Sequence, residues 1–231
     1  FGEGIENVSA DLIYGLPGMT VADLKSDLEK TFAYPVKHLS AYHLTIEDGT
    51  RFGKLKKEGK LKEADEETSA SMFGVLGAVC QEHGFIHYEI SNFALEGYIS
   101  RHNSSYWKQV PYIGLGPSAH SFDRRSRQWN VSDVKKYIRA IEKGEIPSER
   151  EELDRLTVFN EYVMTSLRTM WGIDLLHVEE MYDKELHDYL VNLSDRYIRY
   201  GLMKREKNTL ILTDQGKMIS DNIIAELLAD L

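Results

Sequence analysis

A histidine, an amide, a phenol and an indole lie within six positions of the chain, in the stretch SRHNSSYW at residues 100–107. They are His102, Asn103, Tyr106 and Trp107, and Arg101 precedes them. A haem site needs an imidazole for the axial position on iron, flat apolar surface against the macrocycle and a cation near its propionates. The stretch contains each of these groups. The same residues also fit a loop that is anchored by its two aromatic rings, with His102 hydrogen-bonded to backbone and Asn103 holding a turn.

Spacing and neighbouring charges bear on this choice. If the stretch forms a helix, His102 and Tyr106 lie on one face, because residues four apart are neighbours on a helix surface. His120 follows two glycines at the end of an expected strand and faces either a cavity or the core. A basic patch, formed by Arg124, Arg125 and Arg127, is either a solvated face or a site for propionates or another anion. His38, His43 and His87 lie on expected strands, where we expect structural roles.

The elements that position these residues alternate between strand and helix over the first half of the chain. The expected strands are residues 7–16, 38–46, 85–90 and 112–122, and the expected helices between them are residues 20–32 and 63–83. Thr20 is the expected N-cap of the first helix. Gly114 and Gly116 suggest that the last strand lies close to other backbone. Alternation of this kind predicts a parallel sheet with helices packed against it.

Helical periodicity replaces this pattern from residue 131 onward, and a second domain is expected to begin near residue 145. A long helix is expected over residues 151–170, followed by a short segment, a helix over 184–200, a small β-wing and a last helix from Asp214. This order is typical of a winged helix. Acidic residues outnumber basic ones by sixteen to nine over residues 151–231, which argues against DNA binding.

Composition describes a folded, acidic protein. The 231 residues are 42% hydrophobic, with a net charge of -9, so a nonspecific surface for nucleic acid or anionic membrane is not expected. One cysteine, Cys80, excludes an internal disulfide framework, and a cytoplasmic location is the default expectation. Cys80 lies in a helical pattern, where a small buried hydrophobe is expected. The chain starts without Met and runs at once into a strand, so we expect upstream structure to be missing.

Three ordered segments carry a family resemblance: DLIYGLPGMT at 11–20, HLSAYHLTIEDGT at 38–50, and YEISNFALEGYISRHNSSYW with YIGLGPSAHSF within 88–122. They resemble the oxygen-independent coproporphyrinogen III oxidase-like branch of the radical S-adenosylmethionine (SAM) proteins. The HNxxYW pattern is similar to that of the haem chaperone subgroup of this family. The resemblance implies an α/β fold: residues 1–125 form the C-terminal part of a partial (β/α) TIM-like barrel, 126–150 a helical connector, and 151–231 a mainly helical winged-helix-like domain.

The resemblance also implies site residues and cofactors. It matches Asp11 with an acidic residue that contacts SAM, and Thr45 and Leu115 with weaker backbone contacts to SAM. It implies haem contact through His102, Tyr106 and Trp107, with Asn103 in the haem loop. Family members hold a [4Fe-4S] cluster on three cysteines, and this chain has one cysteine, so no residue here is expected to ligate the cluster.

The leading functional hypothesis is a protein that binds haem and delivers it to haem-accepting proteins, with SAM and the cluster modulating the event in the intact protein. Two alternatives stay open. One is an oxygen-independent coproporphyrinogen III dehydrogenase that decarboxylates propionates oxidatively to protoporphyrinogen IX; the other is a winged-helix module that binds a partner. In every case we expect the chain alone to be enzymatically inactive, and to self-associate through an exposed barrel edge.

Overall fold

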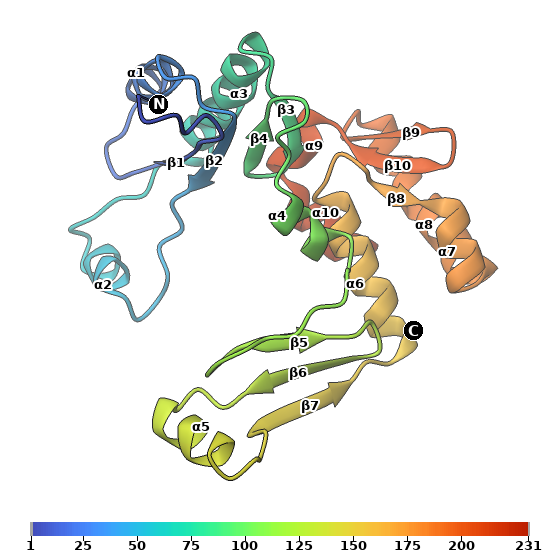
Figure 1. Cartoon of the computed structure of the whole chain (residues 1–231). Coiled ribbons are helices and arrows are strands. Elements are labelled where there is room, and N and C mark those ends of the chain that lie inside the picture. Colours follow the sequence, from blue (N-terminus) through green and yellow to red (C-terminus); the bar gives the residue numbers. More distant parts are fainter. Residues whose placement is uncertain (1, 231) are drawn as a thin grey trace. The chain divides into compact units, whose positions relative to one another are not determined.

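The computed structural model describes residues 2–230, which divide into two compact units (Figure 1). Of these described residues, 2–101 and 212–220 form the first unit, and 102–211 and 221–230 form the second. A short segment near the C-terminus therefore belongs to the N-terminal unit. The division into residues 1–125, 126–150 and 151–231 stays a prediction.

The first unit is built on a four-stranded sheet in the order β1-β2-β4-β3. Its strands are β1 (Ser9–Tyr14), β2 (His38–His43), β3 (Ile86–Glu89) and β4 (Asn92–Ala94). β1 and β2 are parallel, as expected, whereas β4 pairs antiparallel with both β2 and β3. The expectation of a purely parallel sheet is therefore wrong at β4, because a tight turn after β3 returns the chain between β2 and β3.

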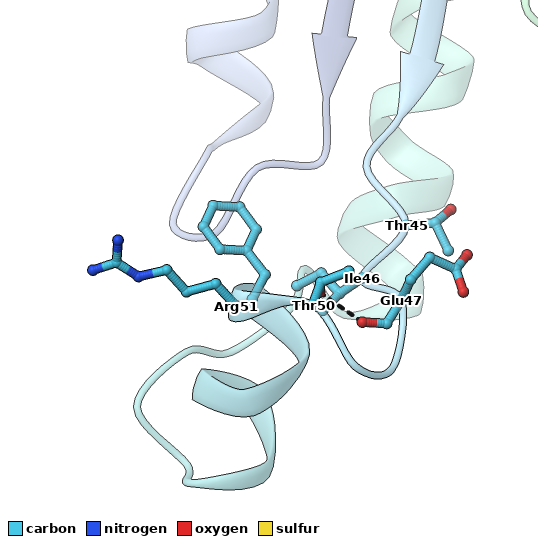
Figure 2. Close-up of a pocket in the computed structure, with 6 residues that line it drawn as sticks. Thr45, Ile46, Glu47, Thr50 and Arg51 are labelled. Carbon is cyan, nitrogen blue, oxygen red and sulfur yellow. Dashed lines mark hydrogen bonds between the residues drawn. The ribbon is translucent and has the colours of Figure 1, made fainter. Parts of the chain in front are cut away.

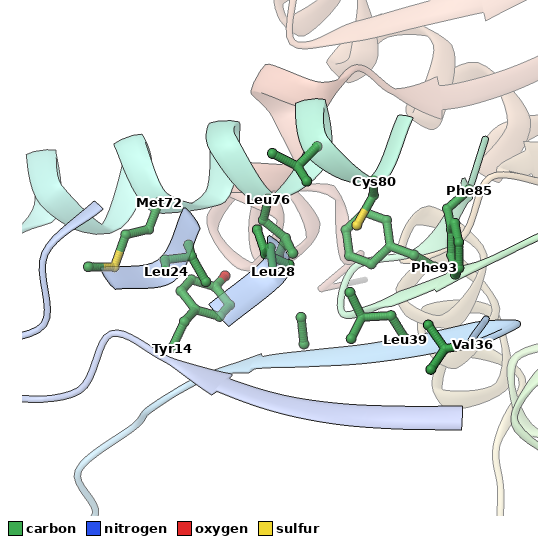
Figure 3. Close-up of a cluster of buried hydrophobic side chains, with 12 residues drawn as sticks. Tyr14, Leu24, Leu28, Val36, Leu39, Met72, Leu76, Cys80, Phe85 and Phe93 are labelled. Carbon is green, nitrogen blue, oxygen red and sulfur yellow. The ribbon is translucent and has the colours of Figure 1, made fainter. Parts of the chain in front are cut away.

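Between its strands this unit contains the helices α1 (Val21–Phe32), α2 (Arg51–Lys57) and α3 (Glu66–Glu82). Thr20 caps α1 as expected, accepting a hydrogen bond from the backbone N–H of Asp23 while the Asp23 carboxylate accepts one from the N–H of Thr20. Figure 3 shows Met72, Leu76 and Cys80 of α3 pointing into the core, toward the strands that carry Tyr14 and Leu39. Burial of these apolar faces is the main force that holds the helices on the sheet.

Cys80 lies in this core and is fully buried, as expected for a small hydrophobe. Burial raises the pKa of its thiol to about 12, because a thiolate would be formed away from water. The thiol is therefore protonated at neutral pH. This environment suits packing and does not suit a metal ligand.

In the turn after β1, the backbone of Gly15 lies close to the ring of His43. Gly15 and Gly18 both have positive φ, at 72° and 78°. A Cβ on Gly15 would lie 2.4 Å from Nε2 of His43, whereas a Cβ on Gly18 would meet nothing within 4 Å. We expect Gly18→Ala to lower the free energy of unfolding by about 1–2 kcal/mol, the left-handed backbone cost alone. Gly15→Ala should cost more in a urea titration, and equal losses would contradict the contact with His43.

The second unit starts in α4 (Arg101–Trp107) and contains a three-stranded antiparallel sheet. Its strands are β5 (His120–Phe122), β6 (Ser126–Asn130) and β7 (Ser148–Glu152), with α5 (Val134–Ile141) between β6 and β7. The single strand expected over residues 112–122 is wrong, because the chain folds back between Tyr112 and Phe122, which form an isolated antiparallel bridge. The segment expected as a helical connector is helical only over α5.

The chain can fold back here because glycine allows two backbone segments to lie close together. A Cβ on Gly114 would lie 2.1 Å from the carbonyl oxygen of His120, so no larger residue fits there. Gly116 has φ of 104°, and its carbonyl accepts a hydrogen bond from Asn130 Nδ2. The close backbone approach expected at these two glycines is confirmed at Gly114 and is wrong at Gly116, where a Cβ would meet nothing within 4 Å and the positive φ favours glycine.

The rest of the second unit has the element order of a winged helix. It contains α6 (Arg155–Leu167), β8 (Ile173–Asp174), α7 (Leu175–Met181), α8 (Lys184–Arg199), β9 (Met203–Glu206), β10 (Thr209–Leu212) and α10 (Ser220–Leu227). The helix expected from Glu151 begins only at Arg155, because Glu151 pairs within β7 and Asp154 is the N-cap. The last expected helix is divided in two, and its first piece, α9 (Asp214–Met218), belongs to the first unit.

Across residues 2–230, no helix is both long enough and apolar enough to cross a membrane.

Candidate functional site

The HNxxYW stretch is helical and places two of its rings together. His102 and Tyr106 lie one turn apart on α4, with ring centres 5.1 Å apart at an angle of 89°. This is an edge-to-face contact, which aromatic pairs favour. The shared face predicted from the spacing is confirmed, and Tyr106 keeps 46% of its surface exposed.

His102 offers an open imidazole. Its side chain is exposed, and neither ring nitrogen is hydrogen-bonded to any residue within the described part of the chain. The alternative in which backbone holds His102 is therefore not what the structure contains. An imidazole in this state keeps a nitrogen lone pair for a ligand such as haem iron.

The aromatic row continues beyond the motif. Tyr112 lies with its ring centre 5.0 Å from that of Tyr106, and Phe122 follows at 6.0 Å from Tyr112. Sequence reasoning missed Tyr112, because it follows α4 in an irregular segment. Its aromatic type five residues after Trp107 was the one available signal.

The other two residues of the motif have different surroundings. Trp107 is partly buried, and Cζ of Arg168 lies 5.8 Å from its ring centre, a cation–π geometry. Asn103 is also partly buried. Trp107 thus anchors the helix by packing, which is the structural role expected for both aromatic rings if the stretch binds no haem. Tyr106 does not share this role, because it stays exposed.

The arginines of the basic patch make different contacts. Arg127 forms an ion pair with Glu161 at 2.8 Å, which already satisfies part of its charge. Arg124 has φ of 74° and donates from Nε to the carbonyl of Gln109, at 3.1 Å. Gln109 lies in the turn that follows α4 and itself has φ of 51°. Two left-handed residues that are not glycine therefore meet directly behind the HNxxYW helix, a placement that stores strain.

The expected SAM residues are distributed over both units. Asp11 lies on β1 with an exposed side chain and pairs in register with Ser40 of β2. Thr45 follows β2 and lines a cavity of about 320 Å³ (Figure 2). Figure 2 shows the Arg51 side chain extending away from Thr45. Leu115 belongs to the second unit and is 87% exposed.

The strand histidines have structural roles, as expected. His38 is buried between Ser9 and Tyr88: its Nδ1 lies 2.8 Å from Ser9 Oγ and its Nε2 2.7 Å from the Tyr88 hydroxyl. Burial lowers the pKa of His38, and the nearby carboxylate of Asp11 partly opposes this. His120 is exposed and lines a cavity with Trp129, which decides the alternative left open by the sequence.

The described residues do not fit an iron–sulfur cluster. They contain one cysteine, buried and protonated, and no group of three or more His, Cys, Asp or Glu residues that would hold a metal ion. A cluster needs several thiolates at one point. No chemical step is therefore assigned to a cluster held by these residues.

Comparison with known proteins gives consistent relatives, although no family model matches the chain. The haem chaperone HemW of Bacillus subtilis is 32% identical over 229 residues, covering 99% of this chain and 60% of that protein. The mitochondrial radical S-adenosyl methionine domain-containing protein 1 of Danio rerio is 34% identical, covering 74% of this chain and 41% of that protein.

One solved structure shares the fold. Coproporphyrinogen III oxidase (HemN) of Escherichia coli, a radical SAM enzyme, superposes with a TM-score of 0.75 and 18% identity, over 100% of this chain and 56% of that one. The expected fold class, part of a radical SAM α/β fold followed by a mainly helical part, is thereby confirmed. The chain spans about 60% of the length of the HemW relatives that it matches from end to end.

Proposed function

Because this chain belongs to the HemW subgroup of the HemN-like radical SAM family, we propose that it binds haem and delivers it to haem-accepting proteins. The HemW relatives are named as haem chaperones, and the similarity extends through the segment that contains His102. Haem is then the cargo of the protein, and its binding must be tight enough to protect it and weak enough to release it.

One observation carries the proposal: the exposed imidazole of His102, which has no hydrogen bond within the described residues and lies edge-on to Tyr106. Haem iron takes a neutral imidazole as axial ligand, and the macrocycle needs flat apolar surface beside it. His102 supplies the nitrogen and Tyr106 supplies a ring on the same face of α4. Trp107 holds the helix against its surroundings and supports the site from behind.

The test is an optical titration of the chain with ferric haem. We expect His102→Ala to weaken saturable binding about tenfold or more and to shift the Soret band, because the axial ligand is lost. His177→Ala is the matched control: His177 is also exposed, lies on a helix of the same unit, and has its ring centre 4.9 Å from that of Tyr162. Equal binding by both variants and the parent chain would refute a haem site at His102.

SAM and a [4Fe-4S] cluster belong to this proposal only for the intact protein, and Asp11 and Thr45 are the proposed SAM contacts in the first unit. Leu115 is a further proposed contact. When bound, SAM would present ribose hydroxyls that can donate hydrogen bonds to an aspartate carboxylate such as that of Asp11. We also place the protein in the cytoplasm, where its acceptors would take haem from it.

A further inference from the structure

A cavity of about 530 Å³ lies in the second unit, at the end of the aromatic row that starts at His102. Small-molecule sites have volumes of roughly 300–1,000 Å³, are mostly apolar, and contain a few placed polar groups. The cavity has this composition. Its apolar lining comes from Pro111, Tyr112, Ile113 and Phe122, and its polar lining includes Gln128 and Arg150.

Tyr112 connects the cavity to α4. Its ring contacts Tyr106, which in turn contacts His102, and each of the two centre-to-centre distances is close to 5 Å. A planar molecule the size of haem, held at the His102 imidazole, is therefore large enough to reach the ring of Tyr112 as well. Ile113 also lines the cavity and is 83% exposed, so its apolar side chain is open to a ligand.

Cations lie beside the cavity, on the turn that joins β5 to β6. Asp123 of this turn and Ser126, the first residue of β6, line the cavity, and Arg124 and Arg125 lie between them in the sequence. The Asp123 carboxylate accepts hydrogen bonds from the backbone N–H groups of Arg125 and Ser126, at 2.9 and 2.6 Å, which hold it within the turn and lower its pKa. Arg124 is fixed by one bond from Nε to Gln109.

Arg150 lines the cavity, and its guanidinium is already engaged. Arg150 donates from Nε to Glu152 at 2.8 Å and lies 3.7 Å from Asp123. An additional carboxylate at Arg150 would face two like charges. Arg124 has no ion pair with any residue in the described part of the chain, so it is the better partner for an incoming carboxylate.

We infer that the cavity is the second half of the haem site: the macrocycle packs on Tyr112 and Ile113, and Arg124 binds a propionate. This inference rests on the proposed function and extends it to residues outside the HNxxYW motif. It gives Ile113 a reason for exposure. It also gives the strained pair of Gln109 and Arg124 a role, because the strain fixes the position of the arginine relative to α4.

The apolar lining is tested by Ile113→Glu in ferric haem titrations of the chain. Because Ile113 is exposed, the substitution leaves the fold intact, yet it places a carboxylate against the macrocycle. We expect affinity to fall about tenfold. Ile146→Glu is the matched control, since Ile146 is 71% exposed in the same unit and does not line the cavity. Equal affinity of the two variants would overturn the inference.

The propionate contact is tested by comparing haem with its dimethyl ester, which lacks the carboxylates. Arg124→Ala should weaken haem binding about three- to tenfold and leave binding of the ester unchanged. A loss that is equal for both ligands would mean that Arg124 acts only through Gln109 and α4, and would overturn this contact. Arg139→Ala, which removes an exposed cation from α5, is the control for net charge.

The two proposals fail in different ways. If His102→Ala weakens haem binding while Ile113→Glu and Arg124→Ala do not, haem binding stands and the second half of the site is refuted. If the parent chain shows no saturable binding, or if His102→Ala changes nothing, the proposed function of this chain is refuted and the inference falls with it.

Discussion

Replacing Phe93 by alanine is expected to lower the free energy of unfolding by about 3–5 kcal/mol, the range for removing a fully buried aromatic ring. Phe93 lies on the central strand β4, is fully buried, and stacks on His87 with ring centres 4.1 Å apart. It pairs in register with Leu39 on one side and His87 on the other. Its removal therefore opens a cavity in the middle of the sheet, which the rigid neighbouring strands cannot close.

Urea unfolding followed by near-ultraviolet circular dichroism measures this loss. Phe52→Ala is the matched control, because Phe52 lies on α2 with 45% of its surface exposed and should cost well under 1 kcal/mol. If the two variants lost similar stability, the packing of β4 in the core would be contradicted.

The second large effect is an acid-induced loss of stability at His87. Burial lowers the pKa of His87 from 6.5 to about 4, with Lys217 adding to the shift and the carbonyl of Ile90 and the carboxylate of Asp214 opposing it. Between these two values the unfolded chain binds a proton that the folded chain does not. Protonation of His87 therefore does not reduce the free energy of unfolding above pH 6.5, and it lowers this free energy by about 3 kcal/mol as the pH drops to 4.

A pH series of urea titrations isolates this contribution. His87→Gln should flatten the fall between pH 6.5 and 4, because glutamine keeps a polar side chain without a titrating proton. His43→Gln should leave it intact, since His43 is exposed and bonds only to Ser69 among the described residues. An unchanged slope in His87→Gln would show that other groups cause the acid loss.

Local signals in the sequence were enough for several elements. The apolar run before Gly15 predicted β1, and Thr20 predicted the start of α1. The helical spacing of His102 and Tyr106 predicted their shared face. In each case the decisive contacts lie within about one turn of helix or one strand, so the pattern contains them.

Other elements depend on partners far along the chain. β7 has the sequence SEREE, which is charged and exposed and looks like the start of a helix; it is a strand because β6 pairs with all five of its residues. β4 is three residues long and is defined by its neighbours on both sides. Tyr112 reaches the row of His102 only because Gly114 lets the chain fold back. The SAM contacts of Asp11, Thr45 and Leu115 stay predictions.

The placement of β4 also sets the distance between the parallel strands β2 and β3. β2 and β3 run in the same direction but do not touch, because β4 lies between them. Adjacent strands are about 4.8 Å apart, so Ser40 of β2 and Glu89 of β3, which both pair with Asn92, are separated by roughly 10 Å instead of one strand spacing. β2 also continues past this level to His43, so a molecule that contacts the chain after both strands must span more than that distance, and compact ligands are limited to one end or the other.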